Sequence, residues 1–305
     1  MRVVLAGATG AIGVRLSSAL IAAGHEVVGL TRSPSGAAAL RSRGVEPLIA
    51  DVMQRDGLLR AGSDLRADAV VHELTALKKP PAKHAMMRET NDLRIRGSAN
   101  LVEFAGQIGA TRYLTQSIVF GYGYADHGTT ALTEDDPFGH LAGDRTDEHV
   151  LAMAEAERYA FATAGLDGIA LRYGLFYDLA AMRSSLLRRA MPVASGRKAG
   201  RNRLSWVNIE DAATATVAAL ERGRPGQAYN VVDDHPASWR EVVTAAAKAV
   251  RAPKPIRLPP PVVRLAAPYA ATMMLDVVLA ASNARARDEL GWQPGFPSYR
   301  EGFAL

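Results

Sequence analysis

Short apolar runs alternate with amphipathic stretches over the first 120 residues of the chain. The apolar runs predict strands at residues 2–6, 26–30, 45–49, 69–72, 112–117 and 168–173, and a late strand at 229–232. Intervening stretches predict helices, including those over residues 12–23, 89–107 and 147–164. Strands that alternate with helices are typical of an α/β fold, and we expect a doubly wound parallel sheet.

A glycine-rich turn joins the first predicted strand to the first predicted helix and reads Gly7-Ala-Thr-Gly10-Ala-Ile-Gly13. Gly7 allows the tight turn, Gly10 lets a ligand approach the backbone, and Gly13 lets helix and strand pack closely. The helix start offers free N–H groups to a pyrophosphate. We interpret the motif as a dinucleotide site rather than a plain turn. The residues assigned to this contact are Gly7, Thr9, Gly10, Ala11 and Ile12.

The end of the second predicted strand bears on the choice of nicotinamide cofactor. An acidic residue there normally binds the ribose 2′-hydroxyl of NADH, whereas a cation suits the 2′-phosphate of NADPH. The chain reads Thr31-Arg32-Ser33 and has no carboxylate. Arg32 can grip the phosphate with its planar guanidinium, and Thr31 or Ser33 can add hydroxyl contacts. We expect NADPH/NADP+, with a merely solvated Arg32 as the alternative.

Loop-forming residues become frequent after residue 177. We expect residues 1–177 to form the NADP-binding domain and residues 178–305 a smaller C-terminal substrate lobe that returns the late strand to the sheet. Residues 258–261 read Leu-Pro-Pro-Pro and lead into an apolar stretch, predicted as a helix over residues 262–282. That stretch contains Arg264, Pro268 and Asp276, which argues against a membrane span.

Composition places the chain among folded globular proteins. Hydrophobic residues make up 48% and charged residues 22% of the sequence, which argues against disorder. The absence of cysteine excludes disulfides, thiolate-bound zinc and a thiol nucleophile. No two histidines stand at helical ligand spacing, so we expect no metal. No signal segment precedes the first apolar run, and we expect a cytoplasmic protein.

Positive charge is concentrated between residues 179 and 209. This segment holds seven basic residues and no acidic one, so the rest of the chain carries −2 although the whole carries +5. The basic residues are Arg183, Arg188, Arg189, Arg197, Lys198, Arg201 and Arg203. We interpret residues 180–203 as a lid over an anionic cofactor or substrate, with a solvated loop as the alternative. No nucleic-acid-reading motif accompanies the segment, and we expect neither a nucleic-acid nor a membrane partner.

Further motifs follow the glycine-rich turn along almost the whole chain: Asp51-Val52, His72-Glu-Leu-Thr-Ala76, Gln116-Ser117, Trp206-Val-Asn-Ile-Glu-Asp211, Tyr229-Asn-Val231 and Glu289-Leu-Gly-Trp292. Together they resemble the extended short-chain dehydrogenase/reductase (SDR) group, which includes NAD-dependent epimerases and dehydratases. The resemblance implies a Rossmann sheet of SDR type. It also implies cofactor contacts from Asp51, Val52, Leu74, Thr75, Ala76, Gln116, Tyr173, Gly174 and Phe176.

The SDR group normally moves protons with a Tyr-x-x-x-Lys pair, aided by a Ser or Thr that ends the fifth strand. None of the nine tyrosines has a lysine four positions later. Counting back from Glu157 places His149 and Met153 at the pair, and Ser117 ends the strand. A methionine thioether cannot replace the lysine ammonium. The candidate catalytic residues are Ser117 as an oxygen-orienting donor and His149 as a proton carrier. The alternatives are a plain strand-end hydroxyl for Ser117 and a structural or surface histidine for His149.

The missing pair changes which reactions the site can support. Epimerisation and dehydration of nucleotide sugars begin with oxidation of an alcohol and need a strong base, whereas ketone reduction ends with an alkoxide that accepts a proton from weak donors. We therefore expect an NADPH-dependent ketoreductase whose proton comes from the substrate, water or a weak donor. The alternatives are a nucleotide-sugar epimerase or reductase and a non-catalytic NADPH-binding sensor.

Residue usage bears on the substrate. Thirty arginines against six lysines suggest a GC-rich genome such as that of an actinomycete. With the missing pair, this resembles polyketide-tailoring ketoreductases of the angucyclinone type, which act on polycyclic ketones. Eight residues could line an adaptable apolar pocket, although for any one of them an ordinary core position is the favoured interpretation. They are Met182, Met191, Met273, Met274, Phe176, Tyr177, Trp206 and Tyr269.

Overall fold

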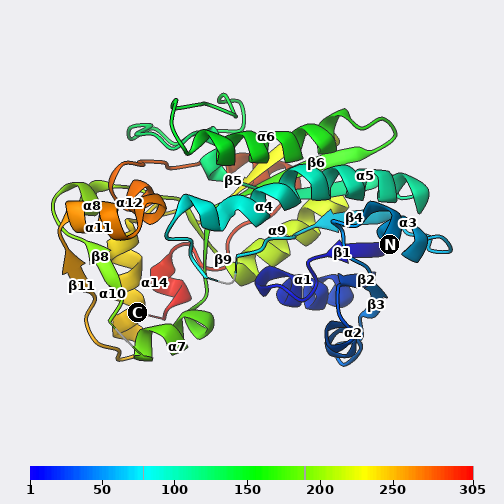
Figure 1. Ribbon diagram of the computed structural model, residues 1–305, viewed down its shortest axis with the longest axis horizontal. Helices are drawn as coiled ribbons and strands as arrows, with labels where there is room; N and C mark the ends of the chain where they lie inside the picture. The colour runs from blue at the N-terminus through cyan, green and yellow to red at the C-terminus, as the bar shows by residue number, and fades with distance from the viewer. Residues whose placement is uncertain (78, 189, 305) are drawn as a thin grey trace.

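A seven-stranded parallel sheet occupies the middle of the molecule (Figure 1). The computed structural model describes residues 1–77, 79–188 and 190–304. The strand order is β10-β6-β5-β4-β1-β2-β3, and neighbouring strands run parallel. The bounds are β1 Arg2–Ala6, β2 Glu26–Thr31, β3 Glu46–Ile49, β4 Ala69–His72, β5 Arg112–Ile118, β6 Asp167–Tyr173 and β10 Ala228–Val231. The predicted doubly wound sheet, late strand included, is confirmed.

The central strands β1 and β4 are almost entirely buried because helices cover both faces of the sheet. Side chains alternate between the faces, so Val3 and Leu5 of β1 enter one core and Val4 the other. The first core is closed by α1 (Ala11–Ala22), α9 (Ile209–Arg222) and α13 (Ala284–Leu290). The second is closed by α3 (Arg55–Ala61), α5 (Ser98–Gln107) and α6 (Asp147–Ala162). The C-terminal part of the chain thus contributes two helices as well as β10 to the sheet layers.

The predicted helix over residues 89–107 is interrupted. A π-helical segment, η2 (Leu93–Gly97), joins α4 (Arg88–Asp92) to α5. A π segment widens the helical turn and redirects the side chains around it, and such segments are frequent at functional sites. A short 3-10 turn, η1 (His84–Met87), leads into α4.

The predicted apolar helix over residues 262–282 is wrong. Two short helices stand there instead, α11 (Pro260–Ala266) and α12 (Pro268–Leu275). Pro268 has no N–H to donate to the preceding turn, so a new helix begins at that residue. Residues 278–281 then pair with other segments through isolated bridges, for example Leu279 with Leu204. Within the described ranges, no helix has the length and apolar character that crossing a membrane requires.

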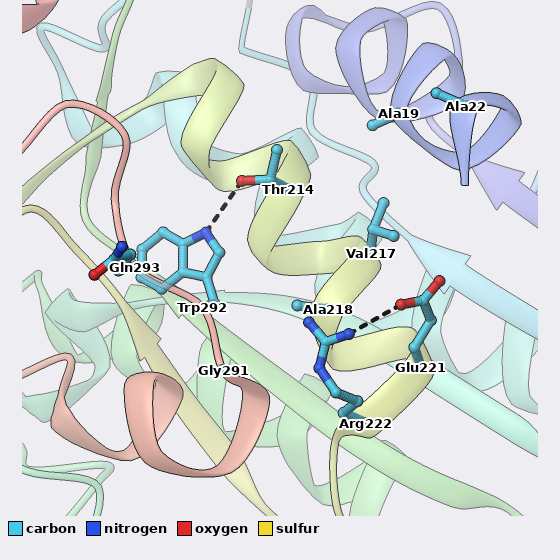
Figure 2. A pocket seen from close by; sticks show the side chains of 10 residues that line it. All are labelled: Ala19, Ala22, Thr214, Val217, Ala218, Glu221, Arg222, Gly291, Trp292 and Gln293. Atoms are coloured by element: carbon cyan, nitrogen blue, oxygen red, sulfur yellow. Dashed lines mark hydrogen bonds and ion pairs between the residues drawn. The ribbon is translucent and has the colours of Figure 1, made fainter.

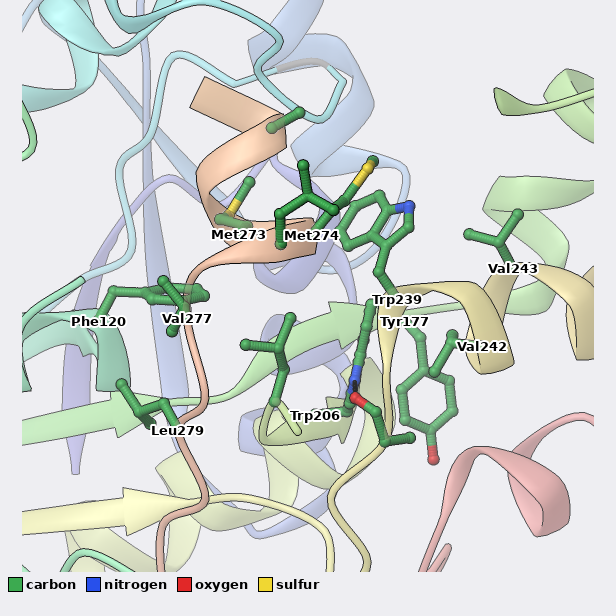
Figure 3. Close-up of a cluster of buried hydrophobic side chains, with 14 of the residues drawn as sticks. Phe120, Tyr177, Trp206, Trp239, Val242, Val243, Met273, Met274, Val277 and Leu279 are labelled. Carbon is green, nitrogen blue, oxygen red and sulfur yellow. Dashed lines mark hydrogen bonds between the residues drawn. The ribbon is translucent and has the colours of Figure 1, made fainter. Parts of the chain in front are cut away.

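The remaining C-terminal elements pack around a third core, part of which Figure 3 shows. They are β7 Leu175–Tyr177, α7 Leu179–Arg188, β8 Pro192–Ala194, α8 Lys198–Arg201, β9 Trp206–Asn208, α10 Trp239–Ala249, β11 Ile256–Leu258 and α14 Tyr299–Gly302. The rings of Trp206 and Trp239 lie 5.5 Å apart, and Met273 and Met274 from α12 belong to the same core. Most residues expected to line a substrate pocket therefore occupy core positions. The stretch expected to be a lid falls on α7, β8 and α8, and Arg189 lies outside the described residues.

Candidate active site

The turn between β1 and α1 has the shape that a dinucleotide requires. Gly7 has a φ of +101°, and a Cβ there would lie 2.6 Å from the carbonyl oxygen of Glu73. A Cβ on Gly13 would lie 2.1 Å from the Gly7 carbonyl oxygen, so only glycine lets the helix come this close. Gly10 is the exposed N-cap of α1, and no side chain of the described residues caps this helix. The first N–H groups of α1 are therefore available to an anion.

The other residues assigned to this turn divide by exposure. Thr9 and Ala11 are exposed on either side of Gly10. Ile12 is buried in the core beneath α1. Its side chain thus holds the helix against the sheet, while Thr9 and Ala11 face the solvent side where a cofactor would lie.

The segment after β2 presents an exposed cation. Arg32 forms no ion pair with any residue that the structure describes. Ser33 is the N-cap of α2 (Pro34–Arg41), where its Oγ accepts a hydrogen bond from Gly36 N at 3.1 Å. Arg32 therefore offers a guanidinium to a phosphate, whereas the start of α2 is already capped by Ser33 and begins with Pro34, which has no N–H.

The segment after β3 is fixed by two hydrogen bonds. Asp51 Oδ1 accepts from Met53 N at 3.0 Å. Asn100 Nδ2 of α5 donates to the carbonyl oxygen of Val52 at 2.7 Å. Val52 is buried, whereas Asp51 is half-buried and keeps part of its carboxylate open to a ligand.

The segment after β4 is held at the carboxyl edge of the sheet. Gln116 Nε2, near the end of β5, donates to the carbonyl oxygen of Leu74. Ala76 N donates to Thr90 Oγ1 of α4 at 3.2 Å. Leu74 and Ala76 are half-buried and Thr75 is exposed. Folds of this kind bind their ligands at this edge.

Tyr173, at the end of β6, points into the core. Its hydroxyl donates to Glu73 Oε1 at 2.8 Å and lies 2.6 Å from Thr216 Oγ1. Burial raises the pKa of Glu73 to about 8, against the opposing effect of the Tyr173 hydrogen bond. Gly174 packs on the backbone at the start of β9, where a Cβ would lie 2.8 Å away. Phe176, in contrast, is 37% exposed and is the one of these three residues whose side chain a ligand can reach directly.

Ser117 lies near the end of β5, where it was expected. Its Oγ is buried and has no hydrogen-bond partner among the described residues. Buried hydroxyls are normally paired, because an unpaired polar group loses its hydration without compensation. The hydroxyl is therefore available to an oxygen of a ligand.

His149, fully buried on α6, stands in a cluster of polar and aromatic side chains. Its Nδ1 lies 2.9 Å from Asn91 Nδ2, and its Nε2 lies 3.0 Å from His84 Nδ1. The His84 ring stacks on it at 5.3 Å, and Tyr269 approaches edge-on at 5.1 Å. The hydroxyl oxygens of Tyr124 and Tyr269 lie 2.7 Å apart. We call these residues, with Arg94, the polar cluster.

The environment keeps His149 uncharged. Burial lowers its pKa to about 4, and the neighbouring His84 and the positive charge of Arg94 act in the same direction. An imidazole with this pKa is neutral near pH 7, and both of its nitrogens already have partners. The geometry therefore gives little support to His149 as the proton carrier.

Profile comparison places these features in a known family. The sequence profile of the "NAD dependent epimerase/dehydratase family" matches residues 3–232 of the chain. The chain belongs to this family. Its family-level resemblance to SDR enzymes is thus confirmed, and a nicotinamide dinucleotide is the cofactor that the glycine-rich turn fits. The choice between NADPH and NADH and the angucyclinone type stay predictions.

Two curated relatives of this chain differ in the activities that their names state. The chain is 37% identical to a "3-diazoavenalumate denitrifying reductase" from Streptomyces, over 99% of each protein. It is 26% identical to a UDP-glucose 4-epimerase from Lacticaseibacillus casei, over 97% of this chain and 92% of the epimerase.

Solved structures of epimerases and dehydratases share the fold. A Thermus thermophilus UDP-glucose 4-epimerase in complex with NAD matches with a TM-score of 0.80 and 23% identity, over 100% of this chain and 97% of that one. A dTDP-glucose 4,6-dehydratase from Streptomyces venezuelae matches with a TM-score of 0.79 and 20% identity, over 100% and 95%. These likenesses confirm the Rossmann-type architecture.

Sequence reasoning missed four members of the polar cluster: His84, Asn91, Arg94 and Tyr124. Asn91 and Arg94 stand three positions apart, Ser98 follows four later, and all three are buried. One face of a predicted helix therefore carries polar residues where its packing side should be apolar. This polar stripe was the feature of the sequence that could have indicated the polar cluster.

Figure 2 shows a concave surface beside Trp292. It is lined by α1, α9 and residues 291–293, and Trp292 Nε1 donates to Thr214 Oγ1 at 3.1 Å within it. Ala19, on its rim, follows Gly10 by nine positions, which is roughly 13 Å along a helix. The surface is therefore distinct from the dinucleotide turn.

Proposed function

We propose that this protein is an NADPH-dependent reductase that directs hydride to an electrophilic aromatic acceptor without a proton relay of its own. The proposal rests on which two residues of α6 occupy the positions where related enzymes have the catalytic tyrosine and lysine. Here His149 and Met153 stand there, and both are fully buried. Neither supplies the acid–base pair on which oxidation of an alcohol depends.

The relative at 37% identity supports a diazo compound as acceptor. Its name gives a diazo substrate and a denitrifying reduction. When N2 is replaced by hydride in an aryldiazonium ion, the C–N bond breaks and its electron pair leaves with N2, while the hydride pair forms the new C–H bond. Atoms and charge balance without a proton, so this reaction does not need the missing Tyr-x-x-x-Lys pair. A bound reduced nicotinamide supplies the hydride.

The chain's own residues bind and orient. The turn from Gly7 to Gly13 and the start of α1 would hold the pyrophosphate. Arg32 would hold a 2′-phosphate, which favours NADPH over NADH. The buried aromatic rings of Tyr124 and Tyr269 exclude water from the space beside His149.

Ser117 favours a second acceptor, the ketone of an aromatic polyketide-like substrate. Its unpaired buried Oγ offers a hydrogen bond to a carbonyl oxygen at the end of β5. The proton of the alcohol would then come from the substrate or from water. Epimerisation of a nucleotide sugar fits less well, because it needs a base that takes the proton of an alcohol.

Isotope labelling tests the proposal. The enzyme is given 4-carboxybenzenediazonium and NADPH that carries deuterium at either face of C4, and an enzyme-free reaction sets the background. We expect one deuterium at the carbon that bore nitrogen, from one face only, with equimolar N2. A panel of aromatic polyketide ketones and UDP- and dTDP-sugars is run in parallel.

Other outcomes of this experiment overturn the proposal. If neither form of labelled NADPH delivers deuterium to the carbon that bore nitrogen, the hydrogen at that carbon comes from solvent. The reaction is then not a hydride transfer from the cofactor. Faster turnover of nucleotide sugars would favour an epimerase or reductase of sugars. Tight NADPH binding without turnover of any acceptor would favour a sensor.

A further inference from the structure

Arg94 is a buried cation without a counter-ion. The residue is only 5% exposed, and its Nε and Nη1 atoms have no hydrogen-bond partner within the described ranges. No described carboxylate pairs with it. A guanidinium taken out of water without compensation is costly, and one left unpaired is rare in proteins. The position thus calls for a partner that the chain does not itself provide.

The surroundings of Arg94 belong to the candidate active site. The residue lies in the π segment η2, one turn after Asn91, which contacts His149. η2 packs against α6, which carries His149, and the positive charge of Arg94 helps to lower the pKa of His149. Arg94 therefore lies beside the rest of the polar cluster.

The cluster is better suited to an anion than to a cation. His84, Glu148 and His149 bring three possible metal ligands together, with Glu148 Oε1 3.7 Å from His149 Nε2. The nearby Arg94 charge repels a dication, and Glu148 is exposed and screened by solvent. The guanidinium, in contrast, can donate to an oxyanion, and so can the one hydroxyl proton that remains after Tyr124 and Tyr269 bond each other.

The cofactor does not account for this site. Its pyrophosphate belongs at the start of α1, and its 2′-phosphate belongs beside Arg32 after β2. Arg94 lies instead in η2, which packs against α6. The anion must therefore come from the second ligand.

We propose that Arg94 binds the carboxylate of an aromatic acid substrate and thereby sets the substrate class of this reductase. This inference rests on the proposed function, because it names the acceptor for the same site. The carboxylate would pair with one edge of the guanidinium, either Nε with Nη2 or Nη1 with Nη2, and so satisfy one of the two unpaired donors. The opposite end of the acceptor would then be directed away from Arg94 and toward the bound nicotinamide.

Binding measurements test the inference independently of turnover. The full chain, saturated with NADP+, is titrated by calorimetry with 4-hydroxycinnamate, with its methyl ester and with sodium chloride. We expect the wild type to bind the acid about 10–100-fold more tightly than the ester. Arg94→Gln should abolish this preference, and Arg94→Lys should keep part of it. Arg96→Gln is the matched control, because Arg96 lies on the same π segment and is exposed.

Thermal stability separates binding from a structural role. Replacing a buried charge that lacks a partner should stabilise the unliganded protein, so we expect Arg94→Gln to raise Tm by roughly 2–4 °C. A structural Arg94 would give a lower Tm or a variant that fails to fold, and either result overturns the inference. So does equal binding of acid and ester, or a preference that survives in Arg94→Gln. Tight binding of chloride that Arg94→Gln abolishes, without preference for the acid, would assign an inorganic anion and overturn the substrate role.

The inference and the proposed function fail in different ways. Arg94-dependent binding of the acid without turnover of any acceptor would retain the carboxylate site and reject the reductase. Turnover of 4-carboxybenzenediazonium and its methyl ester at equal kcat/KM, unchanged in Arg94→Gln, would retain the reductase and reject the site.

Discussion

The dinucleotide turn and the polar cluster are built in different ways. The turn consists of backbone and three glycines within seven residues, and its geometry leaves little room for change. The polar cluster consists of side chains from η1, α4, η2, α6, α12 and the loop that contains Tyr124, each of which can be exchanged singly. Family membership therefore predicts the cofactor of this chain well and its chemistry poorly.

The largest effect is expected at the turn. Gly7→Ala places a Cβ 2.6 Å from a backbone oxygen at a φ of +101° and should weaken NADPH binding by about 100-fold or more, measured by fluorescence titration. Gly24→Ala is the control, because Gly24 also has a positive φ but nothing lies near its added Cβ. If both variants lose binding equally, backbone strain and not the close approach explains the glycine.

Arg32→Ala sharpens the cofactor half of the comparison. Loss of a charge-assisted contact should raise the Kd of NADPH by about 10–100-fold and leave that of NADH unchanged. Arg41→Ala, which removes another exposed arginine of the same region, should change neither. An unaltered NADPH/NADH ratio in Arg32→Ala would assign the 2′-phosphate contact elsewhere.

Glu73, which lies under the turn, gives a pH-dependent effect on stability. Its pKa is about 8 in the folded protein against an ordinary 4.5, so its favourable contribution is complete below about pH 4.5 and is lost as the pH rises through 8. Glu73→Gln should therefore gain unfolding free energy relative to the wild type between pH 5 and 9, measured by urea denaturation. Glu26→Gln, at an exposed site, serves as control. A constant difference across this pH range would show that Glu73 is ionised in the fold.

The smallest effect is expected at Ser117. Ser117→Ala removes a hydroxyl that has no partner in the described structure, so stability should change by less than about 1 kcal/mol. Turnover of a diazonium acceptor should stay within about threefold, whereas turnover of a ketone should fall by roughly tenfold or more. An equal loss with both acceptors would place Ser117 on the cofactor and not on the acceptor oxygen.

The sequence predicted the parts of the molecule that depend on local rules. Strand bounds agree to within one or two residues, because buried parallel strands are short apolar runs between turn residues. The glycine-rich turn was recognised because its function resides in adjacent residues. The prediction of one apolar helix over residues 262–282 was wrong because it relied on the apolar character of the stretch. Pro268 should have indicated a helix boundary, since proline usually breaks or restarts a helix.

The polar cluster could not be assembled from local rules. His84 and His149 meet across 65 positions, and Tyr124 and Tyr269 across 145. Nothing in the pattern around each residue specifies its partner. Only the buried polar stripe of Asn91 and Arg94 could have been read in advance, as an exception to the apolar face of a helix.

The solvent isotope effect on kcat tests the central claim most directly, that the enzyme reduces its acceptor without moving a proton. Wild-type turnover of 4-carboxybenzenediazonium is measured in H2O and in D2O at matched pL, together with deuterated NADPH. The account predicts a primary effect from the labelled cofactor and a solvent ratio near unity that does not vary between pL 6 and 9. A large solvent effect, with a pH profile that His149→Gln abolishes, would contradict it.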